Sequence, residues 1–189
     1  EQLFAGGTVG IIGYGHIGCL LARKLDALGI ACKVYDPWLN RADVAHYSSL
    51  PETLACDVVS IHAELTHAQP WPSFHMLGYE ELRQMDSDAL LINASRGAVI
   101  DSDALYRLLR DGQAPHCVLD VWEDEPRINR ALLSLVRFGS SQIAGYSADG
   151  KYLATRMLRS AMMAHFGLPG DAGAEPEWGE RKRLSLSRQ

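Results

Sequence analysis

Three glycines near the amino end have a spacing that suits the binding of a phosphate group. Residues 9–18 read VGIIGYGHIG, which places Gly13, Gly15 and Gly18 in a GxGxxG pattern between an apolar run and a helical pattern. In such a turn the first glycine permits tight bending, the second lets the backbone approach a pyrophosphate, and the third lets the helix pack closely. Because the amino end of a helix attracts negative charge, this segment is expected to bind a pyrophosphate.

A carboxylate follows at the distance at which a ribose would be bound. Asp36 ends the next β-rich run, eighteen residues beyond Gly18. A carboxylate there can accept hydrogen bonds from both ribose hydroxyls of NAD and would repel the extra phosphate of NADP. A simpler alternative is that the glycines only form a turn and that Asp36 begins a loop with Pro37. The combination of strand, helix and spacing favours NAD as the cofactor.

Two clusters of charged side chains follow later β-rich runs. Residues 93–101 read NASRGAVID and place Arg96 at the carboxyl end of a predicted strand, where ligands bind in open α/β sheets. A guanidinium there could hold a carboxylate through two hydrogen bonds. Residues 120–126 read DVWEDEP and gather the carboxylates of Asp120, Glu123, Asp124 and Glu125. Their spacing alone leaves a binding edge and a solvated acidic loop equally open.

Only a folded sheet could bring these residues together, and the pattern of the sequence predicts such a sheet. β-Rich runs over residues 8–13, 32–35, 58–62, 89–93, 117–121 and 142–144 alternate with helical patterns over 17–28, 79–84, 102–111, 130–136 and 150–166. This alternation predicts an α/β fold with a doubly wound parallel sheet, a Rossmann-type NAD-binding domain. The expected domain covers residues 1–166, and residues 167–189 are expected to form a mobile polar tail.

One connection is longer than a strand-to-helix loop usually is. Residues 63–77 contain two prolines and two histidines and no helical or strand pattern. Long connections of this kind are usually functional, so this loop is expected to take part in a site.

The composition excludes several classes of function. Hydrophobic residues make up 47% and charged residues 22% of the 189 residues, as in a soluble globular domain, and no apolar run is long enough to cross a membrane. The net charge of -5, with a basic cluster only at residues 181–183, argues against a nucleic-acid partner.

The cysteines indicate a reducing compartment. Cys19, Cys32, Cys56 and Cys117 lie far apart within apolar stretches and form no CxxC pair. This favours reduced, buried thiols over disulfides or metal ligands, so we expect a cytoplasmic protein with no metal site. No signal peptide is visible, and a start at Glu1 rather than Met leaves open a fragment or a naturally shortened protein.

Several strings together resemble one enzyme family. VGIIGYGHIG, VYDP, DVVSIHAELT, LLINASRGAVID and LDVWEDEP occur in the order found in the cofactor domain of the D-2-hydroxyacid dehydrogenases, and the resemblance covers residues 8–167. It implies an oxidoreductase that transfers hydride between NAD and a 2-hydroxy acid or a phosphorylated hydroxy acid.

The resemblance also implies roles for individual residues. Arg96 would bind the substrate carboxylate and carbonyl, and Glu125 would pair with a catalytic histidine that accepts the hydroxyl proton. Further contacts would come from Asp120 to the nicotinamide amide, His16 and Ile17 through their backbone to the pyrophosphate, Gly145 to the cofactor, and Tyr146 to the substrate.

Two departures from the family pattern bear on activity. The family has histidine directly before Ile-Ala-Gly-Tyr, where this chain has Gln142, and glutamine cannot accept the proton. Of the seven histidines, His62, His67 and His75 are the nearest alternatives, but each is more often a loop or strand-end residue than a base. The family segment ahead of the glycine-rich motif, which forms most of the substrate domain, is also missing, so we expect no complete substrate domain.

Three functional hypotheses follow. The first is an NAD-dependent dehydrogenase, seen as a fragment or as a divergent member. The second is an NAD-binding module that has lost its chemistry, which Gln142 favours. The third is an interaction protein whose former domain interface meets another chain. In each case a homo-oligomer is expected, because the edge that normally faces a substrate domain would expose apolar surface.

Overall fold

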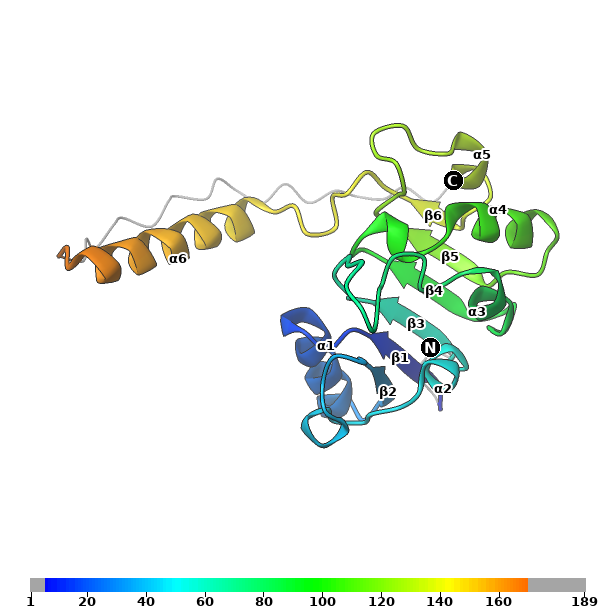
Figure 1. The fold of residues 1–189 in the computed structure, drawn as a ribbon, viewed down its shortest axis with the longest axis horizontal. Helices are drawn as coiled ribbons and strands as arrows, with labels where there is room; N and C mark the ends of the chain where they lie inside the picture. Colours follow the sequence, from blue (N-terminus) through cyan, green and yellow to red (C-terminus); the bar gives the residue numbers. More distant parts are fainter. Residues whose placement is uncertain (1–5, 170–189) are drawn as a thin grey trace. The chain divides into compact units, whose positions relative to one another are not determined.

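The computed structural model describes residues 6–169, in which a single parallel sheet of six strands is the central element (Figure 1). The strands are β1 (Thr8–Ile12), β2 (Ala31–Tyr35), β3 (Val58–Ile61), β4 (Leu90–Asn93), β5 (His116–Leu119) and β6 (Phe138–Gly139). The helices are α1 (His16–Ala27), α2 (Leu50–Leu54), α3 (Tyr79–Arg83), α4 (Ser102–Arg110), α5 (Arg130–Leu133) and α6 (Ala148–Phe166), with 3-10 turns η2 (Arg41–Asp43) and η3 (Gly97–Val99).

The order of the strands creates a crevice for a ligand. The sheet runs β2-β1-β3-β4-β5-β6, so the chain leaves β1 toward one side and returns to its other side at β3. Connections from β1 and β3 therefore diverge above their carboxyl ends, which is where open α/β sheets bind ligands. The predicted α/β doubly wound fold is confirmed.

Alternate residues of β1 belong to different parts of the core. Ile11 is fully buried with Ala22 of α1 and Val34 of β2, whereas Ile12 packs in a larger cluster with residues of β3, β4, β5, α2 and α4. Successive side chains of a strand point to opposite faces, so a strand covered on both faces must be apolar throughout. This explains why β1 reads TVGII.

The sixth strand was predicted in the wrong place. Residues 142–144 are not a strand; β6 is formed instead by Phe138 and Gly139, which pair in parallel with Val118 and Leu119. Gln142 has a left-handed backbone with φ 55°, which a strand does not allow. A Cβ at Gly139 would lie 2.8 Å from the Trp122 ring, so β6 approaches that ring more closely than a side chain would permit.

Helix α2 has no counterpart among the predicted elements. It begins after Ser49, whose hydroxyl accepts a hydrogen bond from the Glu52 N–H while the Glu52 carboxylate accepts one from the Ser49 N–H. This is a capping box, and the string Ser49-Leu-Pro-Glu52 was its signal in the sequence. The hydrogen bonds from Ser49 and Ser48 lower the pKa of Glu52 to about 2.

Two units emerge from the distribution of contacts, residues Glu1–Gly145 and Tyr146–Gln189. Helix α6 belongs to the second unit and ends at Phe166, after which Gly167 adopts the left-handed conformation common at helix ends, so the predicted domain of residues 1–166 includes parts of both units. From residue 170 onward the predicted polar tail lies outside the described residues. No helix among residues 6–169 is long and apolar enough to span a membrane.

The close approach of α2 to β1 leads to a test of the packing. A Cβ at Gly10 would lie 2.3 Å from the backbone oxygen of Thr53. Gly10→Ala is therefore expected to lower the free energy of unfolding by about 1–3 kcal/mol, measured by urea denaturation, because a backbone atom cannot move aside alone. Gly145→Ala is the control, since a Cβ there meets nothing within 4 Å. Equal stability of the two variants would contradict this account of the packing.

Candidate functional site

The glycine-rich turn joins β1 to α1 and has no room for a side chain at two of its three glycines. Gly13 has φ 94°, and a Cβ on it would lie 2.7 Å from the backbone nitrogen of Ala63. A Cβ on Gly18 would lie 2.0 Å from the Gly13 carbonyl oxygen, whereas one on Gly15 would meet nothing within 4 Å. The first and third glycines are thus required by the protein itself, and the second leaves open space above the turn.

The amino end of α1 faces that open space without a protein cap. Gly15 is the N-cap residue and supplies no side-chain hydrogen bond, and both His16 and Ile17 of the first turn are exposed. The first backbone N–H groups of a helix have no acceptor within it. Together with the positive end of the helix dipole, they suit a pyrophosphate.

Asp36 is held directly after the carboxyl end of β2 by two hydrogen bonds from backbone N–H groups. Its Oδ2 accepts a hydrogen bond of 2.8 Å from the Tyr14 N–H, and its Oδ1 accepts one of 3.0 Å from the Trp38 N–H. Each carboxylate oxygen can accept a second hydrogen bond. The side chain is only half-buried, so both oxygens keep capacity for hydroxyl groups of a ligand.

A cavity of about 360 Å³ connects the glycine turn with Asp36. Its walls come from the carboxyl ends of β1, β2 and β3 and include the apolar side chains of Trp38, Leu39, Trp71 and Met76. Apolar walls with a few polar groups are typical of cofactor sites. Sequence reasoning did not identify the two tryptophans, because nothing in their spacing sets them apart from core residues.

The long loop over residues 63–77 forms one wall of this cavity, through Ala63, Glu64, Thr66, Trp71, Ser73 and Met76. The buried Ser73 hydroxyl accepts a hydrogen bond from the Thr66 N–H and donates one to the Glu64 carbonyl. These bonds tie the two ends of the loop together. The loop is therefore positioned against the cofactor cavity, as its length suggested.

Arg96 lies at the carboxyl end of β4 with its guanidinium exposed. Its Nη1 donates a hydrogen bond of 2.7 Å to the Ser95 carbonyl, and its own carbonyl accepts one from the Asn93 side chain. A Cβ on the next residue, Gly97, would lie 2.0 Å from the Trp122 carbonyl oxygen. The turn that contains Arg96 and Gly97 therefore packs closely against the acidic turn of residues 120–126, which follows β5.

Asp120 organises the segment that carries Gln142. The Asp120 carboxylate is buried and accepts hydrogen bonds from the Ser140 hydroxyl and from the N–H groups of Ile143 and Ala144, while its carbonyl accepts one from the Gln142 N–H. Burial alone would raise the pKa of Asp120, but these hydrogen bonds hold it below its usual value. Asp120 therefore remains charged, and it fixes residues 140–144 relative to β5.

Glu125 and Gln142 line one cavity of about 470 Å³, together with Trp122, Pro126, Ile128, Leu133 and residues 139–141. Glu125 accepts a hydrogen bond of 2.7 Å from the Trp122 N–H, and the Trp122 ring nitrogen donates one of 2.8 Å to the Ser140 carbonyl. The structure thus brings together the two positions at which the family pattern has its acid and its histidine. Arg96 is not among the residues that line this cavity.

The alternative histidines differ in their surroundings. His75 has a left-handed backbone with φ 50° and hydrogen-bonds Glu123 through Nε2. His62 hydrogen-bonds the Ser60 hydroxyl, and burial lowers its pKa. His67 is exposed and packs beside Phe74. Only His75 of these three pairs with a carboxylate, in a polar cavity separate from that of Gln142.

Two residues implied by the family pattern lie near the end of the first unit. Gly145 is its last residue, with open space around it, and Tyr146 begins the second unit, where the Lys151 ammonium lies 3.5 Å from the centre of the Tyr146 ring.

All four cysteines are free, and three are buried. Burial raises the pKa of Cys117 to about 12, so this thiol stays protonated.

A comparison with protein families accounts for most of this geometry. The family described as D-isomer specific 2-hydroxyacid dehydrogenase, NAD binding domain, matches residues 1–139. The chain belongs to this family. It carries the family's NAD-binding domain, and the cofactor predicted from the glycines and Asp36 is confirmed as NAD.

Within this family, the chain is similar to erythronate-4-phosphate dehydrogenases. The chain is 46% identical over 166 residues to an erythronate-4-phosphate dehydrogenase from Cellvibrio japonicus and 44% identical over 165 residues to one from Marinobacter nauticus. These alignments cover 88% and 86% of the chain but 44% and 43% of the relatives, so the chain spans less than half their length. The strings at residues 120–126 and 143–151 (IAGYSADGK) already resembled this enzyme in the sequence.

Solved structures of 2-hydroxyacid dehydrogenases are similar to this chain in fold. A D-lactate dehydrogenase from Aquifex aeolicus, complexed with NAD and lactic acid, is similar with a TM-score of 0.68 and 29% identity, over 85% of this chain and 54% of that one. A D-isomer specific 2-hydroxyacid dehydrogenase from Lactobacillus delbrueckii in its NAD complex gives 0.73 and 25%, over 88% and 56%. These similarities favour the dehydrogenase interpretation over a module without chemistry.

The different surroundings of Gly15 and Gly18 separate cofactor binding from folding. Gly15→Ala is expected to raise the Kd for NAD about tenfold or more, measured by calorimetry, because a Cβ would occupy the space meant for the pyrophosphate. Its stability should change by less than about 1 kcal/mol. Gly18→Ala should instead lower stability by about 1–3 kcal/mol through its contact with Gly13. Unchanged NAD affinity in the Gly15 variant would contradict the assigned role.

Proposed function

We propose that the protein containing this chain is an NAD-dependent dehydrogenase of a phosphorylated 2-hydroxy acid of the erythronate 4-phosphate class. The observation that carries the proposal is the arrangement at one sheet edge, where the Asp36 cavity, the exposed Arg96 and the cavity of Glu125 lie at the carboxyl ends of successive strands. The identity of 46% to an erythronate-4-phosphate dehydrogenase supports the substrate class.

Several of the chain's own residues have defined tasks in this proposal. The turn of Gly13 and Gly15, the backbone of His16 and Ile17, and Asp36 would hold NAD, which supplies the hydride acceptor when bound. Gly145 and Asp120 would complete its site, with Asp120 acting mainly by fixing the turn of residues 140–144.

On the substrate side, the exposed guanidinium of Arg96 would bind the carboxylate of the acid through two hydrogen bonds. The resemblance to the family also assigns Tyr146 a contact with the substrate. Glu125 would orient and stabilise a protonated base in the cavity that it shares with residue 142. The missing task is that of the base itself, because the Gln142 amide cannot accept the hydroxyl proton.

The glutamine at position 142 is the one observation on the side of a second function, the binding of NAD without chemistry, whereas the similarities favour the dehydrogenase. A site that retains Asp36, Arg96 and Glu125 but has glutamine at position 142 could bind NAD and release it unchanged. The first function requires turnover of the hydroxy acid and the second does not, so a measurement of turnover separates them.

We also propose that this chain assembles with another copy, in the cytoplasm. Segment 130–145 exposes Leu133, Leu135, Phe138 and Ile143, each by at least 38%, beside the Glu125 cavity. Exposed apolar side chains of this kind are often covered by a second protein surface. Four free thiols suit a reducing compartment.

Asp36 is expected to decide between the two nicotinamide cofactors. The unmodified chain should bind NAD more tightly than NADP, because the Asp36 carboxylate would repel the 2′-phosphate. Asp36→Ala should weaken NAD by about tenfold or more, since a charge-assisted hydrogen bond contributes about 1.5–3 kcal/mol. Calorimetric titration with both cofactors measures this, and equal affinities in the unmodified chain would refute the role of Asp36.

The chain alone is expected to show little turnover with erythronate 4-phosphate or simple 2-hydroxy acids, followed by NADH absorbance. A positioned base typically contributes about a hundredfold to ten-thousandfold in rate, and Gln142 cannot act as one. Gln142→His should raise turnover by less than that, because the exposed Arg96 alone must orient the acid.

Gln142→Asn is the matched control, since asparagine also tolerates the left-handed backbone but cannot titrate. Turnover of about 1 s⁻¹ by the unmodified chain would reach the range of typical enzymes and would contradict the expectation. His75→Ala would then show whether His75, paired with Glu123, serves as the base.

A further inference from the structure

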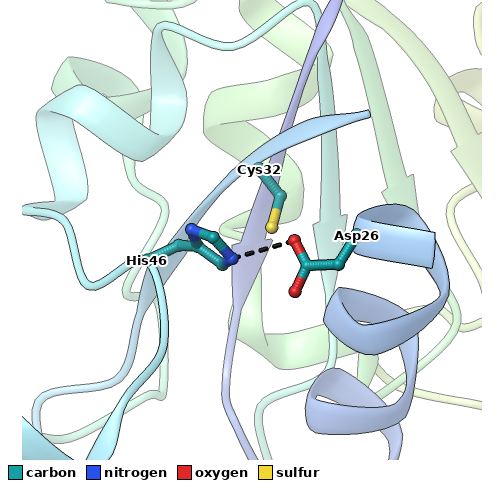
Figure 2. A group of neighbouring side chains, drawn as sticks. All are labelled: Asp26, Cys32 and His46. Atoms are coloured by element: carbon teal, nitrogen blue, oxygen red, sulfur yellow. Dashed lines mark ion pairs between the residues drawn. The ribbon is translucent and has the colours of Figure 1, made fainter. Parts of the chain in front are cut away.

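Three side chains that could bind a metal ion meet on the side of β2 next to α1. Asp26, Cys32 and His46 each offer one ligand atom, and these atoms all lie within 4.8 Å of one another. Figure 2 shows the three side chains pointing toward one another, with the His46 ring and the Asp26 carboxylate on opposite sides and the Cys32 sulfur between them. Among residues 6–169 no other group of three such side chains is this close.

Each ligand comes from a different element, and each is fixed by the fold. Asp26 lies in the last turn of α1, and Cys32 is the second residue of β2. The His46 carbonyl accepts a hydrogen bond of 2.9 Å from the Val34 N–H, and the Ser48 N–H donates one of 2.7 Å to the Val34 carbonyl. The histidine is therefore tied to the strand that carries the cysteine.

Two of these residues occupy positions that cost free energy without a cation. A carboxylate near the carboxyl end of a helix, as at Asp26, opposes the negative end of the helix dipole. His46 has a left-handed backbone with φ 58°, which few residues other than glycine adopt without strain. The exposed ion pair between them, with its 2.9 Å contact, offsets only a little of this cost.

Cys32 lacks the surroundings of a reactive thiol. It is 8% exposed, and burial, with a smaller contribution from the Asp26 charge, raises its pKa. A divalent cation would reverse this situation, because it stabilises the thiolate directly and neutralises the carboxylate at the same time.

We propose that Asp26, Cys32 and His46 form a binding site for Zn²⁺ or a chemically similar divalent transition metal. One sulfur, one imidazole nitrogen and one carboxylate oxygen match the ligands that zinc prefers. A thiolate and a carboxylate balance the two positive charges. The side chains of His46 and Asp26 are 43% and 47% exposed, so water can occupy the fourth position of a tetrahedral site.

The position of the site indicates a structural role. Cys32 lies near the amino end of β2, whereas Asp36 follows its carboxyl end, so the metal would be separate from the cofactor cavity. It would link α1 to β2 and to the segment around His46. These are the elements that carry the pyrophosphate turn and the ribose-binding carboxylate.

The test uses the full chain, freed of metal with a chelator and titrated with Co²⁺, then with Zn²⁺ as competitor. We expect one Co²⁺ per chain and a thiolate-to-cobalt charge-transfer band that Zn²⁺ removes. Zn²⁺ at about 100 times its Kd should raise the unfolding midpoint by about 5–10 °C.

Variants assign the ligands. His46→Asn should raise the Kd at least about 100-fold without unfolding the protein, because asparagine tolerates the left-handed backbone. Cys32→Ser should abolish the charge-transfer band, and Asp26→Asn, at an exposed position, should weaken binding while the fold is kept. His116→Ala, an exposed histidine outside the group, is the matched control and should bind as the unmodified chain does.

Three results would overturn the proposal. The first is the absence of a thiolate band with Co²⁺, and the second is a band that survives Cys32→Ser. The third is unchanged metal affinity in His46→Asn, which would leave the three side chains as an ion pair beside a buried thiol.

Discussion

Two glycines in the turn after β1, Gly13 and Gly18, have no space for a Cβ, and the rest of the cofactor site depends on this constraint. A Cβ on Gly18 would clash with the Gly13 carbonyl, and a Cβ on Gly13 would clash with the backbone that follows β3. The absence of both Cβ atoms lets α1 begin directly above the point where the β1 and β3 connections diverge. Only then does the uncapped amino end of the helix face the same cavity as Asp36. Backbone packing thus places a charge-binding group where the sheet topology leaves a crevice.

On the other half of the sheet, a buried carboxylate has the corresponding role. Asp120 follows β5 and collects hydrogen bonds from Ser140, Ile143 and Ala144, so a segment without a strand ladder is still held in one conformation. Burying a charge is costly unless it is fully hydrogen-bonded, and here the bonds come mostly from backbone N–H groups. One residue therefore determines where position 142 lies relative to Glu125, without being part of the acid–base chemistry itself.

Local patterns predicted the elements where neighbours in sequence decide the structure. The glycine turn, Asp36 and five of the strands follow from spacing and alternation, because each depends on its own few residues. The strand expected at residues 142–144 was wrong for a reason that local patterns do not contain: its N–H groups are bound by a side chain more than twenty residues earlier. Asp26, Cys32 and His46 were not recognised as a group for a similar reason. Their separations fit no ligand motif, and only the packing of α1 on β2 brings them together.

The geometry around position 142 is well defined although a glutamine stands there. Glu125 and Gln142 share a cavity, the Trp122 ring nitrogen donates a hydrogen bond to the Ser140 carbonyl, and the N–H of the left-handed Gln142 donates one to the Asp120 carbonyl. The hydrogen bonds from residues 142–144 to Asp120 hold this strained backbone in place. The geometry of the site and the presence of a proton acceptor therefore depend on different residues. The geometry depends on Asp120 and the turn that follows β5, whereas the proton acceptor depends on the side chain at position 142 alone.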